Sequence, residues 1–179
     1  GPDSTYIRWL LPISKTRMVF RADGPGDEEP WVTDGTTAGT KRLADLYPGS
    51  SSSQAYPLGR IGSVLLMVAD GGPGIGRELY RTDGTKAGTR LVKDLLAGAG
   101  GSDPRDGVVL NGRLYFAAVT GAGRELWVSD GTKAGTKRVA DINPGAGDGK
   151  VQSLTKVGSR IVFFADDGQH GVEPWTYAP

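Results

Sequence analysis

Several residue types that carry chemistry are missing or scarce in this sequence. It has no cysteine, and this excludes disulfides, thiolate metal sites and cysteine nucleophiles. It has a single histidine, His170, and one histidine cannot form a histidine cage for a metal. The net charge is only +1, from 21 Lys and Arg against 20 Asp and Glu, and this balance argues against a nucleic-acid binder. No apolar run approaches the ~20 residues of a membrane-spanning helix, so no membrane span is expected.

Helical periodicity is absent as well. No segment keeps apolar residues at i, i+3, i+4 and i+7 over three turns, so long helices are not expected. Short apolar segments, bounded by Gly, Pro, Ser or Asp, are frequent instead, and glycine alone accounts for 29 residues. This pattern is typical of short β-strands joined by tight turns.

One stretch of the sequence is repeated. ELWVSDGTKAGTKRVADI starts at Glu125, and related copies start at Glu29 and Glu78, with a shortened EPWTY at Glu173. The spacing of about 48 residues indicates a repeat architecture. We expect a single domain, with residues 1–2 as a remnant of protease cleavage and with repeats at approximately residues 6–53, 54–103, 104–149 and 150–179.

Each repeat contains strand-like segments that we term a to d in chain order. Four short antiparallel strands per repeat are the content of one β-propeller blade. The sequence therefore predicts an all-β, four-bladed β-propeller with strand a at the axis, and an incomplete last blade because the fourth repeat ends after segment c. A monomer is expected rather than a dimer. A piece of a larger propeller, or a half that dimerises into eight blades, is the alternative.

Two segments resemble known repeat families. RDGVVLNGRLYFAAV, from Arg105, resembles a kelch blade, in which an inner strand turns at Asn-Gly into a second strand. ELW-x-x-DGT, intact from Glu125 to Thr132, resembles the bacterial ELWxxDGT repeat family. This second resemblance covers nearly the whole chain and implies a secreted or cell-surface bacterial protein.

The repeated acidic residues are expected to be structural. In the Asp-Gly-Thr turn between strands c and d, the aspartate can accept hydrogen bonds from backbone N–H groups two residues on. Gly131 and Gly135 are expected to adopt positive φ there. The glutamates at the start of strand c are expected to form an ion pair or a bond to the backbone. The residues with these structural roles are Glu29, Glu78, Glu125, Glu173, Asp34, Asp83 and Asp130.

An aromatic residue recurs in strand c, and the loops between strands b and c vary. A mid-strand aromatic favours a wedge between blades, and a platform for sugars is the alternative. The candidate ligand-binding residues are Trp31, Tyr80, Trp127, Trp175, Asp27, Glu28 and His170. Asp23 and Asp167 are candidate ligands for a hard cation such as calcium, although calcium prefers six to eight oxygens.

The repeats contain no recognisable catalytic pair, so the sequence predicts a non-enzyme. We predict a secreted or cell-surface binding module that presents variable loops on a rigid scaffold to a protein or a surface polysaccharide. A carbohydrate-binding lectin with one site per blade and a passive structural spacer are the alternatives.

Overall fold

The computed structural model describes residues 6–24 and 26–179. Fifteen β-strands follow one another along these residues, and no helix among them is long and apolar enough to cross a membrane. Gly1 and Pro2, which we expect to be a cleavage remnant, lie outside the described residues. The chain is therefore all-β over the part that is described.

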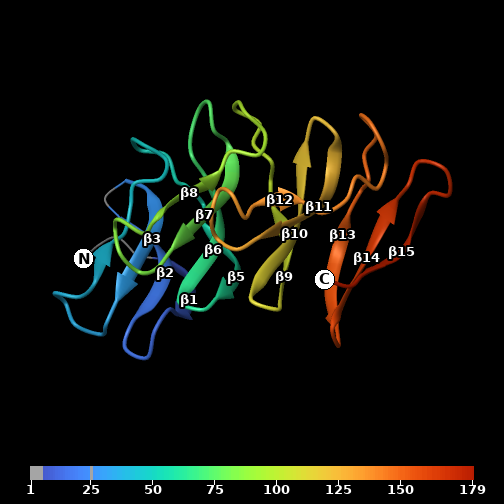
Figure 1. Cartoon of the computed structure of the whole chain (residues 1–179). Coiled ribbons are helices and arrows are strands. Elements are labelled where there is room, and N and C mark those ends of the chain that lie inside the picture. The colour runs from blue at the N-terminus through green and yellow to red at the C-terminus, as the bar shows by residue number, and fades with distance from the viewer. Residues whose placement is uncertain (1–5, 25) are drawn as a thin grey trace.

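The strands form four antiparallel sheets, coloured from blue to red along the chain in Figure 1. Sheet A contains β1 (Ile7–Pro12), β2 (Met18–Asp23), β3 (Glu28–Thr33) and β4 (Lys41–Arg42). Sheet B contains β5 (Tyr56–Ile61), β6 (Val64–Asp70), β7 (Arg77–Thr82) and β8 (Arg90–Lys93). Sheet C contains β9 (Arg105–Leu110), β10 (Arg113–Thr120), β11 (Gly123–Ser129) and β12 (Lys137–Arg138). Sheet D has three strands, β13 (Gln152–Val157), β14 (Arg160–Asp166) and β15 (Val172–Tyr177).

Tight turns connect the strands in the order of the sequence. Asn111 and Gly112 both have positive φ, 51° and 69°, which suits the two-residue hairpin between β9 and β10. In that hairpin Leu110 pairs with Arg113 and Val109 pairs with Leu114. Consecutive strands are therefore neighbours within each sheet, and the sheets are meanders.

The sheets pack face to face through apolar side chains. Because side chains alternate between the two faces of a strand, each sheet has an N-side face, toward the preceding sheet, and a C-side face, toward the following one. Between sheets C and D, for example, Tyr115 and Ala117 pack in one cluster with Phe163 and Ala165. Similar clusters join sheet B to sheet C and sheet A to sheet B.

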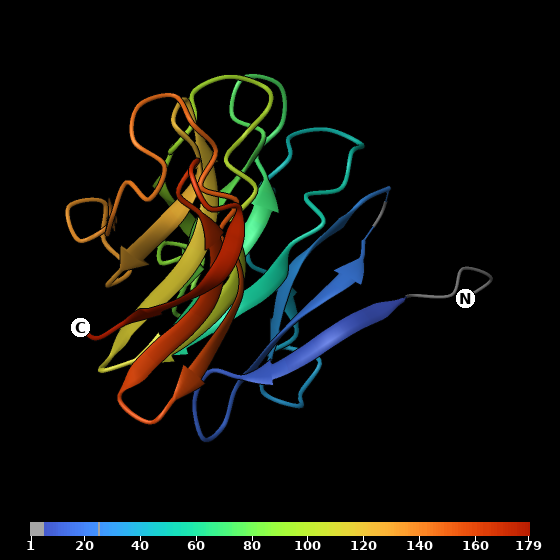
Figure 2. The same ribbon diagram turned by 90° about the vertical axis from the view of Figure 1, so that its right-hand side faces the viewer.

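The four sheets form an open row and not the closed four-bladed ring expected from the sequence. Sheets A and D lie at opposite ends of the row in Figure 1, and the view in Figure 2 also separates them. The first strand of sheet C, β9, contacts both β5 of sheet B and β13 of sheet D, so these strands a line the same side of the row. Within residues 6–24 and 26–179, the buried apolar clusters join only sheets that are neighbours in the chain.

Candidate functional site

A buried glutamate organises the loop that follows sheet B. The Glu78 carboxylate, fully buried at the start of β7, accepts hydrogen bonds from the backbone N–H groups of Leu95 and Leu96 at 3.1 and 3.2 Å. It also accepts hydrogen bonds from the backbone N–H and the hydroxyl of Ser102, at 2.8 and 2.6 Å. Burial raises the pKa of Glu78, while the bonds from Ser102, Leu95 and Leu96 oppose this rise. One side chain thus holds both ends of the loop that leads to the next sheet.

The equivalent glutamates act in the same way in two other sheets. Glu29 accepts from the N–H groups of Leu46 and Tyr47, and Glu125 accepts from those of Ile142 and Gly149. Both carboxylates are buried, and burial raises the pKa of each. Glu173 is exposed, and sheet D has three strands among the described residues, so no fourth strand covers this side chain there. The loops after sheets A, B and C are therefore pinned at one edge of the row.

Arginines gather at this pinned edge, beginning in sheet A. Arg8 Nε lies 3.1 Å from Glu28 Oε1, and Arg21 Nε lies 3.5 Å from Glu28 Oε2. Arg21 also donates to the carbonyl of Ala55, 3.2 Å away, and so reaches across to sheet B. Burial and the neighbouring Arg8 and Arg77 lower the pKa of Arg21, while Glu28 raises it. The first two arginines therefore share one carboxylate.

The arrangement continues across sheets B and C. Arg77 lies over the ring of Tyr56, 5.3 Å from its centroid, and 3.5 Å from the carboxylate of Asp103. Arg124 donates to the carbonyl and the carboxylate of Asp103 at 3.0 and 3.3 Å. Burial and the nearby Arg105 lower the pKa of Arg124, and Asp103 raises it. A single aspartate thus bridges arginines from two sheets.

We call this set the arginine row: Arg8, Arg21, Arg77, Arg105 and Arg124. Its carboxylate partners are Glu28 and Asp103, so guanidinium groups outnumber the carboxylates that pair with them. Arg105 is exposed at the start of β9, where its backbone pairs with Ala117 of β10, and its side chain forms no hydrogen bond or ion pair with the described residues. The planar donors of arginine suit carboxylates, which they can bind in a bidentate manner.

The arginine row was not predicted from the sequence. Among the candidate ligand residues predicted from the sequence, only Glu28 contacts the arginine row, as a carboxylate partner of Arg8 and Arg21. The available signal was that Arg77 and Arg124 each directly precede a repeated glutamate. Arg8, Arg21 and Arg105 lie in other strands, and only the packing of the sheets brings them to the same edge.

The repeated aromatics occupy the interfaces between sheets. Tyr80 is buried in the cluster between sheets A and B, and Trp127 in the cluster between sheets B and C. Burial raises the pKa of Tyr80 to about 12. Trp31 and Trp175 are half-buried. The expectation that all four form a ligand-binding set is therefore corrected: Tyr80 and Trp127 are inaccessible because the preceding sheets cover them.

Asp27 belongs to a cluster of acidic residues in sheet A. Carboxylate oxygens of Asp27, Glu29 and Asp45 lie within 4.8 Å of one another. The Arg42 guanidinium already lies among them, since its Nη2 is 2.7 Å from Asp27 Oδ2 and 2.9 Å from Asp45 Oδ1. This cluster is an ion-pair network in which the Arg42 guanidinium occupies the place that a metal cation would take.

The two aspartates proposed for a hard cation do not meet. Asp23 ends β2 in sheet A, whereas Asp167 lies in the loop before β15 in sheet D, at the other end of the row. Asp167 Oδ1 accepts from the N–H groups of Gln169 and His170, at 2.9 Å each. Its Oδ2 lies 2.8 Å from His170 Nδ1. Both oxygens of Asp167 are thus engaged in its own loop.

The pairing of His170 with Asp167 predicts a shifted titration. The bond to His170 lowers the pKa of Asp167 to about 2, and the aspartate raises the pKa of His170. The charged pair is thus complete below the ordinary histidine pKa of about 6.5 and is lost as pH rises through the higher folded value. We expect NMR titration of this single histidine to show a pKa above 6.5, falling toward 6.5 in Asp167→Asn. Equal pKa values in the two proteins would contradict the pairing.

The Asp-Gly-Thr turns are built alike in sheets A, B and C. In sheet C, Asp130 Oδ1 accepts from the N–H and hydroxyl groups of Thr132 at 2.8 and 2.7 Å. Asp34 and Asp83 make the same bonds to Thr36 and Thr85. Gly131 has a φ of 85°, as expected, but Gly135 does not have positive φ. The reason for glycine at 135 is proximity, because a Cβ there would collide with the Asp130 carboxylate.

Comparison with known proteins places the fold among β-propeller domains. No family model matches the sequence, and no curated protein matches it either. Acylaminoacyl peptidase from Pyrococcus horikoshii is similar in structure, with a TM-score of 0.54 and 13% identity over 99% of this chain and 26% of that chain. The β-propeller domain of the Trilobed protease from Pyrococcus furiosus, reported with an open velcro topology, has a TM-score of 0.51 and 13% identity over 99% of this chain and 53% of that one.

A third similar structure comes from an analysis of two prolyl endopeptidases. Its TM-score is 0.51, with 11% identity over 96% of this chain and 26% of that chain. The chain thus spans between about a quarter and about half of the length of these three chains. At these identities the likeness shows the fold alone, and the resemblance to ELWxxDGT repeats stays a prediction.

These comparisons overturn the prediction of a non-enzyme. The similar chains are peptidases or part of a protease, and the region matched is only a portion of each. Sheets of this kind therefore occur inside larger enzymes. The lack of a catalytic pair within the repeats does not decide whether the protein is an enzyme.

Proposed function

We propose that this chain is a binding module of the β-propeller type, which uses the arginine row to recognise a carboxylate-bearing protein or surface polysaccharide. The observation that supports this best is the arginine row itself. Five arginines from three neighbouring sheets lie along one edge, and the Arg105 side chain has no partner among the described residues. A ligand with several carboxylates can bridge these groups.

The scaffold beneath the arginine row favours this function. Glu29, Glu78 and Glu125 hold the loops after their sheets through buried hydrogen bonds. A rigid binding surface loses little conformational entropy when a ligand binds. Bidentate bonds from arginine to carboxylate add strength and geometric specificity.

The other predicted functions have weaker support. A lectin with one aromatic platform per blade conflicts with the burial of Tyr80 and Trp127. A passive spacer would not need a row of partly unpaired arginines. An extracellular or cell-surface location stays a prediction from the ELWxxDGT resemblance, and protease treatment of intact cells would test it.

Binding to carboxylated polymers tests the proposal. Titrations with poly-glutamate and with polygalacturonate, and with dextran as the neutral control, distinguish a peptide from a sugar source of carboxylates. We expect Arg105→Ala to weaken binding about tenfold, since a charge-assisted hydrogen bond contributes about 1.5 kcal/mol or more. Added salt should weaken it further.

Lys133→Ala is the matched control, because Lys133 is an exposed cation in the Asp-Gly-Thr turn of sheet C, away from the arginine row. It should leave binding unchanged. Equal losses in both variants, or equal binding of dextran, would contradict a specific carboxylate site. Binding of dextran that depends on Trp31 would support the lectin instead.

A hard cation also stays a proposal, with Asp23 as the freer of the two candidate ligands. Arg42 already pairs with Asp27 and Asp45, so we expect any cation bound by the loop carboxylates to contribute little to folding. We expect EDTA to lower the midpoint of thermal unfolding only slightly, because a weakly bound ligand stabilises in proportion to its occupancy. An unchanged midpoint would exclude a structural ion, and restoration by calcium would identify the metal.

A further inference from the structure

The large hydrophobic side chains that are exposed among the described residues are confined to the two ends of the row. Six large hydrophobic residues are exposed, and none belongs to sheets B or C. Ile7 and Leu10 lie on the N-side face of sheet A, and Tyr6 directly precedes β1. The other three lie on the C-side face of sheet D: Val157, Phe164 and Val172. These are the two faces that no neighbouring sheet covers.

Residues at the same repeat positions inside the row are buried. Val157 is 57% exposed, whereas Leu110, its equivalent in sheet C, is 4% exposed. Phe164 is 46% exposed, and its equivalent Ala117 is fully buried. Leu10 is 48% exposed, and its equivalent Leu154 is 8% exposed. The end faces therefore have the composition of internal interfaces without the sheet that covers them.

The N-side face of sheet A also repeats the pattern of the other N-side faces. On each such face, strand b contributes two large apolar residues and an alanine, and strand c contributes an aromatic residue. The sets are Met18, Phe20, Ala22 and Trp31 in sheet A; Leu65, Met67, Ala69 and Tyr80 in sheet B; Leu114, Phe116, Ala118 and Trp127 in sheet C; and Ile161, Phe163, Ala165 and Trp175 in sheet D. In sheets B, C and D this set packs on the C-side face of the preceding sheet.

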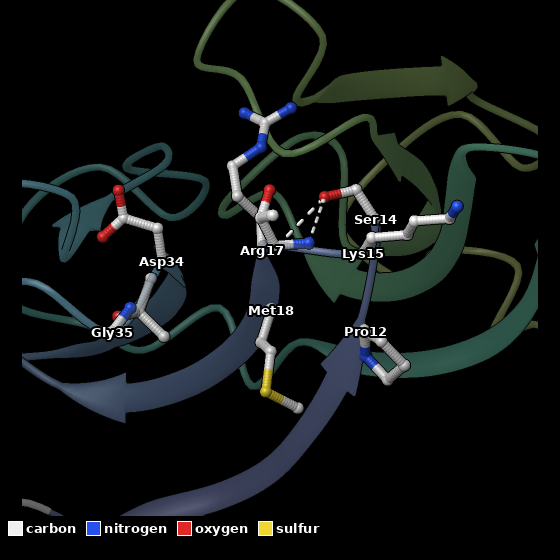
Figure 3. Close-up of a pocket in the computed structure, with 9 residues that line it drawn as sticks. Pro12, Ser14, Lys15, Arg17, Met18, Asp34 and Gly35 are labelled. Carbon is white, nitrogen blue, oxygen red and sulfur yellow. Dashed lines mark hydrogen bonds between the residues drawn. The ribbon is translucent and has the colours of Figure 1, made fainter.

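A hollow marks where the missing sheet would insert (Figure 3). It has a volume of about 480 Å³ and lies beside Pro12, Met18 and Gly35. The equivalent glycine in sheet B, Gly84, is covered by the preceding sheet. Arg17 Nη1 lies 3.2 Å from the Gly84 carbonyl oxygen, and a Cβ on Gly84 would lie 3.1 Å from Ile13 Cγ2.

We propose that a second copy of this chain covers these faces in a head-to-tail dimer. The C-side face of sheet D in one copy would pack on the N-side face of sheet A in the other. Val157 is the repeat equivalent of Ile13 and Arg160 that of Arg17, so in the dimer these two side chains would enter the hollow beside Gly35. Arg160 would then donate to the Gly35 carbonyl as Arg17 does to that of Gly84, and the neighbouring Asp34 carboxylate would complement its charge.

Two such contacts close the assembly. Head-to-tail interfaces form a closed ring when the rotation that relates one copy to the next brings the last copy back onto the first. Two copies related by a twofold axis meet this condition and share two identical interfaces. The result is a ring of eight sheets in which every apolar end face is covered. This proposal is independent of the proposed function, because it concerns the end faces and not the arginine row.

Light scattering on the purified chain tests the dimer. The chain has a mass of 18.8 kDa, and we expect about twice this value at micromolar concentration. Phe164→Asp should give the monomer mass with an unchanged circular dichroism spectrum, and Lys133→Asp should leave the dimer intact. Arg160→Ala should raise the dissociation constant about tenfold. Arg113→Ala, at the equivalent position of sheet C, should not.

Cysteine cross-linking tests the head-to-tail arrangement, since the chain has no cysteine of its own. A mixture of the single variants Leu10→Cys and Phe164→Cys should form disulfide-linked dimers, whereas neither variant alone should. Cross-linking of either variant with itself would show that like faces pack, and would overturn the proposal. A monomeric wild-type protein, or an open series of larger polymers, would overturn it as well.

Discussion

Replacing Glu78 with alanine should lower the free energy of unfolding by about 3–5 kcal/mol. The substitution leaves three backbone N–H groups and the Ser102 hydroxyl without their shared acceptor. An unsatisfied buried donor costs about 1–3 kcal/mol, and part of this loss is recovered when the loop rearranges to admit water. The loop after β8 would then detach from sheet B. Urea unfolding followed by tryptophan fluorescence measures the change.

Glu173→Ala is the matched control, because Glu173 occupies the same repeat position but is exposed. It should change stability by no more than about 0.5 kcal/mol. Glu78→Gln should fall between the two, since the amide keeps one acceptor oxygen and loses the charge. A loss below about 1 kcal/mol in Glu78→Ala would show that the carboxylate does not hold the loop.

Gly101→Ala should be the most damaging glycine substitution in the loop that Glu78 holds. Gly101 has a φ of 62°, and a Cβ there would collide with the backbone of Arg77. Left-handed backbone costs a non-glycine residue about 1–2 kcal/mol, and overpacking adds about 1–3 kcal/mol. We expect a total loss of about 3 kcal/mol, together with weaker binding of carboxylated polymers because Arg77 is displaced.

Gly112→Ala separates the two causes. Gly112 has a similar φ of 69°, but no atom lies within 4 Å of the position of a Cβ. This variant should lose only about 1–2 kcal/mol, from backbone strain alone. Equal losses in the two variants, measured by urea unfolding, would mean that the close approach to Arg77 is not maintained in solution.

Much of the fold follows from short-range patterns in the sequence. Apolar segments between turn residues predicted the antiparallel strands, and the sheet topology confirms an all-β chain of four repeated sheets. The Asp130 turn follows from local spacing, because its acceptor and donors lie only two residues apart. The sequence predicted that Gly135 is needed for a positive φ. In the structure, glycine is needed there because a Cβ would collide with the Asp130 carboxylate. The spacing of residues along the chain does not reveal such a contact in three dimensions.

The candidate site was less accessible to sequence reasoning. Arg105 and Arg124 lie in different strands of sheet C, and Arg21 belongs to sheet A, so nothing in their spacing indicates a common edge. Tyr80 and Trp127 share a repeat position, and that position alone does not say whether a ring faces solvent or a neighbouring sheet. Both questions depend on how one sheet packs on the next.

By itself, the sequence determined the repeat, the strands and the turns of this protein, because hydrogen bonds and side-chain alternation within a repeat are local. Only the tertiary structure decided that the sheets form an open row. The angle between packed sheets depends on the volumes of the side chains between them, and Phe116 and Trp127 contribute to that volume from strands that are separate in the chain. The same packing brought the arginine row together and left Val157 and Phe164 exposed at the end of sheet D.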